Sequence, residues 1–411
     1  MTDAQLSRRV AWAVALAATF TMTVSQLDRT TLAVLAPTVT KELGISETAY
    51  GWLTSAFSVA YLIGTPIAGW WIDRAGARRG LVWSVLVWST IAALHSLALG
   101  FVTLFMLRIA LGLAESPSYP GSAQTVQRIV PPRDSARGFG VLFTGSSIGV
   151  MIAAPLASFM FAAAGWRVAF LGSAAIGLAW VPLWIALTRR RDVRARLDAR
   201  HVTPTTALPG PKLSWREFVS QPDVVRVIVA VFAAAPITGF AIAWGAKYLV
   251  RTFGVTQSDV GHYLWLPMVG FDVAAVVFGD LSSRQNRAPG EPPRLLFGIA
   301  AVLASSLTLL PLATSAWMAM GIIGIAMAGA GALYTLSSSD LLTRVPPGRV
   351  ALASSVLAAS QSLVLIIANP LIGLSVTHFE SYAPASVALG LWVIPGCAIW
   401  LFWRPRAASS G

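Results

Sequence analysis

The feature that most constrains this chain is a series of long apolar segments. Twelve of them are long enough to cross a bilayer as helices. They lie at roughly 10–37, 48–72, 80–99, 101–129, 137–163, 166–188, 224–250, 258–281, 294–314, 315–341, 349–375 and 384–403. The sequence therefore predicts an all-α membrane protein with twelve transmembrane helices.

The composition agrees with this prediction. Of the 411 residues, 56% are hydrophobic and 11% are charged, whereas charged residues make up about a quarter of an ordinary soluble domain. The single Cys397 rules out a disulfide framework, and the four histidines have no metal-ligand spacing. We expect an integral membrane protein with no separate soluble domain, no cleavable signal peptide, no bound metal and no cofactor.

The basic residues alternate between loops. Most of the 30 Lys and Arg residues fall in every second loop, and only Lys41, Arg167, Lys247 and Arg251 lie on or near the other side. Under the positive-inside rule, this pattern predicts that both termini are cytoplasmic. The net charge of +13 is thus explained by membrane topology, and we expect no nucleic-acid partner.

One polar stretch, residues 189–222, divides the segments six and six. We predict an N-terminal six-helix bundle at 1–188, a basic cytoplasmic linker at 189–223 and a C-terminal six-helix bundle at 224–411. The arginines and prolines of the linker favour poor order, and a simple connector is favoured over a specific lipid-binding or regulatory role. Two six-helix halves are the layout of a transporter that works by alternating access.

Four charged residues lie inside the predicted spans: Asp28, Arg29, Arg108 and Glu115. Charges at that depth are costly in hydrocarbon, so we expect them to face a polar cavity and to serve transport. Arg108 and Glu115 are seven residues apart and project from one helix face. The alternative is a permanently paired internal network, which we consider less favoured because buried ionic clusters are seldom kept for stability alone.

The loop after the second segment carries a motif. It reads Gly69-Trp70-Trp71-Ile72-Asp73-Arg74-Ala75-Gly76-Ala77-Arg78-Arg79. This loop resembles the signature loop of the major facilitator superfamily, with Ala77 in place of the usual basic residue, and a weaker copy follows at 278–284. The resemblance implies two pseudo-symmetric six-helix bundles and a cytoplasmic gate latched by Asp73, Arg74 and Arg78.

Several further stretches resemble the anion:cation symporter family within that superfamily. They are residues 27–32, Ser55-Ala56-Phe57 with Tyr61, residues 108–120, residues 131–138, and Gly165-Trp166-Arg167 with Phe170, and in the second half Pro267 with Asp272 and Ser339-Asp340 before Pro346. That family includes bacterial hexuronate, aldonate and aldarate transporters and animal organic-anion and vesicular glutamate carriers. This chain has Ser25 and Gln26 where the family usually has Asn and Tyr.

The resemblance implies roles for the four buried charges. Arg29 and Arg108 would hold a substrate carboxylate, because a guanidinium pairs with a carboxylate through two parallel hydrogen bonds and keeps its charge. Asp28 and Glu115 would carry the coupling proton, because substrate and acid compete for the same arginine. The expected function is proton-coupled symport of a small organic anion, a sugar acid such as a hexuronate or aldonate.

Other polar residues are weaker candidates. For substrate binding they are Tyr61, Gln26, Lys247, Tyr334, Gln361, Asn369 and Asp272, and for gating they are Arg133 and Asp340. Each has a structural alternative: a lysine can extend to the membrane interface, and polar side chains can join helices by hydrogen bonds.

Alternatives to a sugar-acid symporter remain open. A carrier of a monocarboxylate or aromatic acid would keep the same arginines. A drug or cation exporter would need an unpaired carboxylate, and a non-transporting sensor would need an output domain. An enzyme is not expected, since the sequence shows no nucleophile and base or metal constellation. It has no Walker A sequence, so we do not expect transport to be driven by ATP hydrolysis. We expect a monomer in the bacterial inner membrane, with membrane lipids and a small organic anion as its partners.

Overall fold

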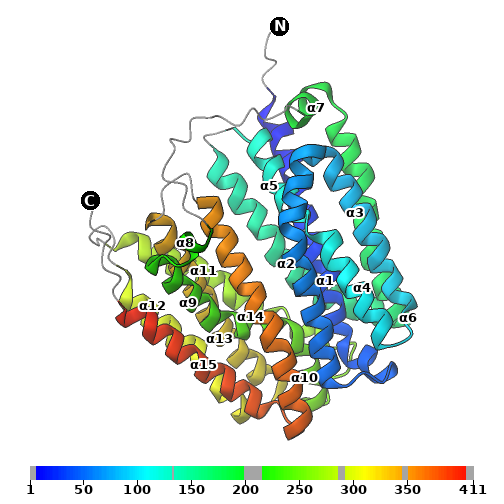
Figure 1. Cartoon of the computed structure of the whole chain (residues 1–411). Helices are drawn as coiled ribbons and strands as arrows, with labels where there is room; N and C mark the ends of the chain where they lie inside the picture. The colour runs from blue at the N-terminus through cyan, green and yellow to red at the C-terminus, as the bar shows by residue number, and fades with distance from the viewer. Residues whose placement is uncertain (1–5, 132–133, 199–214, 286–291, 345–349, 404–411) are drawn as a thin grey trace. The chain divides into compact units, whose positions relative to one another are not determined.

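The computed structural model describes residues 6–131, 134–198, 215–285, 292–344 and 350–403 (Figure 1). Every regular element within these ranges is a helix. The chain forms two compact units. The first unit contains residues 1–201 together with Ala243–Trp265, and the second contains Val202–Ile242 and Leu266–Gly411.

The helices of the first unit carry the candidate charges. They are α1 (Arg8–Glu42), α2 (Glu47–Ala75), α3 (Ala77–Leu94), η1 (His95–Leu97), α4 (Phe101–Glu115), α5 (Ser118–Ile129), α6 (Ser135–Thr188), α7 (Arg191–Asp198), α10 (Gly245–Phe253) and η4 (Val260–His262). The second unit is built from α8 (Trp215–Val219), α9 (Pro222–Gly239), α11 (Leu266–Arg284), α12 (Arg294–Ser305), η5 (Ser306–Leu312), α13 (Ala316–Arg344), α14 (Val350–Phe379) and α15 (Ala383–Phe402). A short π-helix, η3 (Phe240–Trp244), crosses the boundary between the two units.

Eleven of the described helical stretches are long and apolar enough to cross a membrane. One of them is too long for a single crossing, because the 54 residues of α6 would extend about 80 Å and the hydrocarbon core is about 30 Å thick. The helix breaks at Ala164 and Gly165, where Gly165 has a φ of 81° that favours glycine. This break divides α6 into two predicted spans, and the all-α fold of a multi-pass integral membrane protein is confirmed.

Helix α1 is held against α6 by very close backbone approach. A Cβ atom on Gly149 would lie 2.5 Å from the Thr23 carbonyl oxygen, and one on Gly145 would lie 2.6 Å from the Thr19 carbonyl oxygen. The Thr23 hydroxyl donates to the Gly145 carbonyl oxygen at 2.9 Å. Two glycines four residues apart therefore form the small-residue face that lets the helices touch. This contact fixes the part of α1 that bears the candidate charges.

Helices α2 and α4 approach in the same way. A Cβ atom on Gly112 would lie 2.5 Å from the Phe57 carbonyl oxygen and 2.9 Å from Ala60 Cβ. The contact holds α4, which carries the buried side chains of Arg108 and Glu115, closely against α2.

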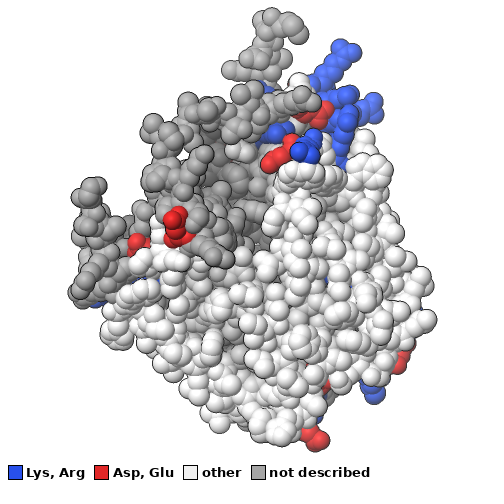
Figure 2. Space-filling model, viewed as in Figure 1, with Lys and Arg blue, Asp and Glu red and all other residues white. Residues whose placement is uncertain are grey.

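The linker differs from its prediction. Residues 191–198 were expected to be poorly ordered, but they form α7, whose Val193 and Leu197 are fully buried in an apolar cluster with Trp180 and Trp184. Four-residue spacing puts both apolar side chains on one helix face, and their burial outweighs the tendency of the arginines to stay solvated. Figure 2 shows Lys and Arg side chains gathered at this end of the first unit, around α7. We call it the linker end, and the end with Glu42 the opposite end.

In the second unit, α9 packs against α13, α14 and α15, and α11 packs against α13. Glycines again allow the closest approach, since a Cβ atom on Gly270 of α11 would lie 2.5 Å from the Gly324 carbonyl oxygen of α13. The second unit therefore uses the same packing principle as the first.

Candidate functional site

A cluster of four charged side chains lies inside the first unit, on α1 and α4. Arg29 Nε lies 2.6 Å from Glu115 Oε2, with side-chain exposures of 20% and 0%. Ser25 joins this pair: its hydroxyl donates to Glu115 Oε2 at 2.8 Å and accepts from Arg29 Nη2 at 3.0 Å. Glu115 Oε1 is buried and has no hydrogen-bond partner.

Arg108 is buried but only loosely bonded. Its Nη1 and Nη2 atoms lie 3.4 and 3.5 Å from the Arg29 carbonyl oxygen, and its Nε has no hydrogen-bond partner. The guanidinium also interacts electrostatically with Glu115 and Asp28. Each N–H of a buried guanidinium normally has a partner, so this side chain has capacity for a ligand.

Asp28 is also buried, with neither carboxylate oxygen reached by a hydrogen bond of ordinary geometry. The Ser173 hydroxyl is a polar neighbour of Asp28, but it donates to the Phe170 carbonyl oxygen at 3.1 Å. A buried carboxyl group without firm donors is well suited to take up a proton. The two acids of the cluster thus differ: Glu115 accepts hydrogen bonds through one carboxylate oxygen, whereas Asp28 accepts none of ordinary geometry.

Two aromatic rings of α2 cover the Arg29 guanidinium. Arg29 Cζ lies 4.3 Å from the centre of the Tyr61 ring and 5.0 Å from that of Phe57, and the two rings are stacked with centres 5.9 Å apart. Cation–π contacts favour a charged guanidinium in a partly dry site. Tyr61 is half-buried, as is Gln26, which lies on α1 against α6 beside Gly149.

Lys247 lies in the first unit but is paired away from this cluster. Its Nζ lies 3.1 Å from Glu47 and donates to the Thr40 hydroxyl at 2.6 Å, and it lies 5.1 Å from the centre of the Tyr50 ring. Only 6% of the lysine is exposed, so it is a buried ion-pair partner in this arrangement. Its role in substrate binding stays a prediction.

The candidates of the second unit lie on three helices. Asp272 is on α11, Tyr334 on α13, and Gln361 and Asn369 on α14. Asn369 is buried, and the other three are half-buried. Their roles in substrate binding also stay predictions.

The signature loop links three helices at the linker end. Asp73 Oδ1 accepts from Gln124 Nε2 at 3.0 Å, and Gln124 Oε1 accepts from the Ala77 backbone N–H at 2.9 Å. Arg74 stacks on Trp70 at 4.0 Å. Arg78 makes a two-pronged ion pair with Asp198 of α7 at 2.9 Å, a contact that the sequence did not suggest. Burial opposes the ionisation of Asp198, but its hydrogen bonds with Arg78 and Arg194 outweigh this and lower its pKa.

The other two gating candidates have different outcomes. Arg133 lies outside the described residues. Asp340 lies 3.6 Å from the buried guanidinium of Arg226 within the second unit. Arg226 Nε also donates to the Trp400 carbonyl oxygen at 2.9 Å and stacks over the Trp400 ring, so Asp340 belongs to a network that joins α9, α13 and α15.

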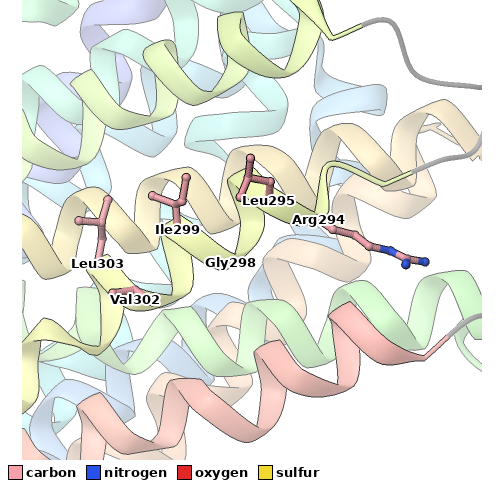
Figure 3. Close-up of a pocket in the computed structure, with 6 residues that line it drawn as sticks. All are labelled: Arg294, Leu295, Gly298, Ile299, Val302 and Leu303. Atoms are coloured by element: carbon pink, nitrogen blue, oxygen red, sulfur yellow. The ribbon is translucent and has the colours of Figure 1, made fainter.

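A surface groove runs along α12, and Figure 3 shows that one helix supplies all of its lining. The lining residues are Arg294, Leu295, Gly298, Ile299, Val302 and Leu303. Apart from Arg294 they are apolar, and Leu295 and Val302 are each 73% exposed. A site for a polar ligand needs several convergent polar groups, which the lining of this groove lacks, and its exposed apolar side chains match those expected of a predicted span.

Two residues that contact the charged cluster were not identified as functional from the sequence. Ser25 precedes Arg29 by four residues, and Phe57 precedes Tyr61 by four, so helical spacing was an available signal for both. No spacing rule indicates that Thr40, Glu47 and Tyr50 surround Lys247, because about two hundred residues separate them in the chain. Among the described residues, no group of three His, Cys, Asp or Glu side chains is arranged to hold a metal ion.

The chain is similar in sequence to several bacterial transporters named for sugar acids. The chain is 30% identical over 246 residues to a hexuronate transporter of Bacillus subtilis (strain 168), a match that covers 60% of this chain and 58% of that protein. It is 27% identical over 332 residues to the hexuronate transporter of Escherichia coli (strain K12), with 76% of each chain covered. It is 25% identical over 405 residues to the probable galactarate/D-glucarate transporter GarP of the same strain, covering 92% of this chain and 91% of that protein.

A solved structure supports the fold. A bacterial homologue of the human lysosomal transporter Spinster, in an inward-facing and unoccupied conformation, superposes with a TM-score of 0.85 at 19% identity. The match covers 98% of this chain and 100% of that one. These relatives are transporters rather than enzymes, and the resemblance found in the sequence is confirmed. The family model of the Major Facilitator Superfamily matches residues 18–368, so the chain belongs to the Major Facilitator Superfamily.

Proposed function

We propose that this protein is a secondary active transporter that moves a sugar acid, such as a hexuronate, aldonate or aldarate, together with protons. The observation that carries the proposal is the buried cluster of two arginines and two acids, in which only Arg29 and Glu115 are firmly paired. The sugar acids for which the three relatives are named suggest the substrate class.

Substrate binding begins at Arg29 in this proposal. Its side chain is 20% exposed, whereas Arg108, Asp28 and Glu115 are almost fully buried. A carboxylate can form a two-pronged pair with the Arg29 guanidinium while Tyr61 and Phe57 keep it in place. The unsatisfied N–H of Arg108 then offers a second donor.

Coupling follows from competition for the arginines. When the substrate carboxylate takes Arg29, Glu115 loses its cation and its neutral form becomes favoured. Glu115 therefore takes up a proton as substrate binds, and Asp28 does so beside Arg108. Substrate and proton cross together as the site alternates its access between the two sides of the membrane.

The remaining candidates have supporting roles. We assign Tyr334, Gln361, Asn369 and Asp272 to the sugar hydroxyl groups, because amide, hydroxyl and carboxylate groups match them as donors and acceptors. Asp73, Arg74 and Arg78 serve a gate at the linker end of the first unit, and Asp340 serves gating within the second unit. The protein is proposed to act as a monomer in a bacterial inner membrane with both termini cytoplasmic, as the alternation of basic loops indicates.

A second candidate is a carrier of another organic anion, such as a monocarboxylate or an aromatic acid. The stacked pair of Phe57 and Tyr61 beside Arg29 favours it, since a flat ring could stack there.

Thermal stabilisation of the detergent-purified protein tests the proposal. The panel contains glucuronate, galacturonate, gluconate, galactonate, galactarate, lactate, benzoate and neutral hexoses, at acidic and neutral pH. A ligand that binds only the folded state raises the melting temperature by mass action. We expect a shift with a sugar acid that is absent with its neutral sugar and lost in Arg108→Ala.

The other outcomes separate the alternatives. A shift with benzoate or lactate alone would favour the second candidate. A shift with neutral hexoses alone would contradict the assignment of both arginines. Uptake of the stabilising anion into proteoliposomes, driven by an imposed pH gradient, then tests proton coupling.

A further inference from the structure

The hydroxyl of Ser25 occupies the junction of the charged cluster. Ser25 is fully buried, and its Oγ bonds both members of the ion pair, Glu115 Oε2 at 2.8 Å and Arg29 Nη2 at 3.0 Å. A serine hydroxyl has one proton to donate and can accept two hydrogen bonds. Since the Arg29 Nη2 group can only donate, the hydroxyl must direct its own proton to Glu115.

The two oxygens of Glu115 are therefore unequal. Oε2 receives hydrogen bonds from Ser25 and from Arg29 Nε, whereas Oε1 is buried and receives none. A proton that arrives at Glu115 meets two donors at Oε2 and none at Oε1. The vacant oxygen is thus the one that can be protonated without breaking a hydrogen bond.

We propose that Ser25 is a positioning residue that holds Glu115 by Oε2 and so reserves Oε1 for the coupling proton. Its hydroxyl also keeps Arg29 close when protonation weakens the ion pair, so that the guanidinium is ready for the substrate carboxylate. This inference rests on the proposed function, because it concerns the acid assigned there to proton transfer.

The inference predicts the effect of removing the hydroxyl. Ser25→Ala takes away a donor to the ionised carboxylate, so Glu115 binds its proton at higher pH. Loss of one hydrogen bond to a charged group corresponds to a shift of about one pH unit. Ser25→Thr keeps the hydroxyl and should restore the original midpoint.

The experiment measures melting temperature against pH from 5 to 9 without any added anion. The proteins compared are the wild type, Ser25→Ala, Ser25→Thr and Thr21→Val, each with and without Glu115→Gln. The part of the profile that depends on Glu115 is the difference between each protein and its Glu115→Gln counterpart. Thr21→Val is the control, because the buried Thr21 hydroxyl bonds only the Ala17 carbonyl oxygen of its own helix.

We expect the Glu115-dependent midpoint to move up by about one pH unit in Ser25→Ala, to return in Ser25→Thr and to stay in place in Thr21→Val. The inference is overturned if Ser25→Ala lowers the melting temperature equally at all pH values. It is also overturned if the wild type and Glu115→Gln differ by a constant amount, because Glu115 then does not titrate. Since no substrate is present, failure of the sugar-acid panel would contradict the proposed function and leave this result standing.

Discussion

Glu115 is the acid of the cluster that is firmly paired with an arginine. In its ionised form it balances Arg29 at 2.6 Å, and removal of one partner from a buried pair typically costs about 3–5 kcal/mol. Protonation of Glu115 therefore releases Arg29 from a strong local restraint. In the proposed mechanism, an arginine released in this way binds the substrate anion, and the protonation state of Glu115 then sets the affinity for that anion.

Glu115→Gln tests this link. Glutamine keeps the shape and can still accept from Ser25 and Arg29, but it does not titrate. We expect loss of proton-driven accumulation in proteoliposomes, while counterflow exchange of the same anion stays within about threefold of the wild type.

Glu42→Gln is the matched control for that variant. Glu42 lies at the opposite end of α1, where it accepts from Trp166 and Arg167 on the partly exposed surface. Accumulation should survive this change. Loss of counterflow together with accumulation in Glu115→Gln would assign Glu115 to substrate binding instead.

At the scale of elements, the seam between α1 and α6 determines where the charged cluster lies. Its glycines leave no room for a side chain, because Gly149 faces the Thr23 carbonyl oxygen and Gln26 Cβ. The seam therefore sets the depth and rotation of α1, and with them the direction of Ser25 and Arg29.

Gly149→Ala should weaken this seam. The added methyl group would lie 2.5 Å from a backbone oxygen, and overpacking of this kind costs about 1–3 kcal/mol, against a gain of about 1 kcal/mol in helix propensity. We expect a lower melting temperature and weaker stabilisation by the sugar acid.

Gly140→Ala on the same helix is the control. Apart from its chain neighbours and the adjoining backbone of its own helix, no atom lies within 4 Å of a Cβ placed there. This variant should therefore gain the helix propensity alone and melt at the same temperature or higher. Equal melting temperatures for the two variants would show that α1 can move away from α6 without cost.

At the scale of the whole molecule, the two compact units do not divide at the linker alone. Residues Ala243–Trp265 follow α9 of the second unit in the chain but pack within the first. Their polar contacts there include Lys247 with Glu47, and Gln257 Nε2 with the Val34 carbonyl oxygen at 2.8 Å. A buried lysine without an anionic partner destabilises the fold, so the packing of residues Ala243–Trp265 in the first unit depends on the ion pair between Lys247 and Glu47.

A double-mutant cycle measures how much Lys247 and Glu47 stabilise each other. Lys247→Met leaves the half-buried Glu47 without this cation, and Glu47→Gln leaves the buried Lys247 without its anion. Each variant should lower the melting temperature by several degrees. The double variant should lose less than the sum of the two, because neither charge is then left unpaired. Arg251→Gln should have a smaller effect, since Arg251 is 39% exposed and lies 3.7 Å from Glu47. Strictly additive losses would show that Lys247 and Glu47 do not stabilise each other.

The properties that the sequence determined by itself are local ones. Segment length and hydropathy predicted the spans, because a span depends only on its own residues. The gap between the predicted spans 137–163 and 166–188 falls where α6 breaks, at Ala164 and Gly165. The cost of charge in hydrocarbon singled out Asp28, Arg29, Arg108 and Glu115 before any contact was known.

The tertiary structure alone decided which residues became partners. Arg29 pairs with Glu115 of α4 and not with Asp28 beside it, because adjacent residues on a helix point in different directions. Lys247 meets Glu47, and Asp198 meets Arg78, through helices that are distant in sequence. Which residues become partners depends on how each helix is rotated and how closely the helices pack. Small residues such as Gly149 allow the close packing, but the local sequence does not show which helix lies against them.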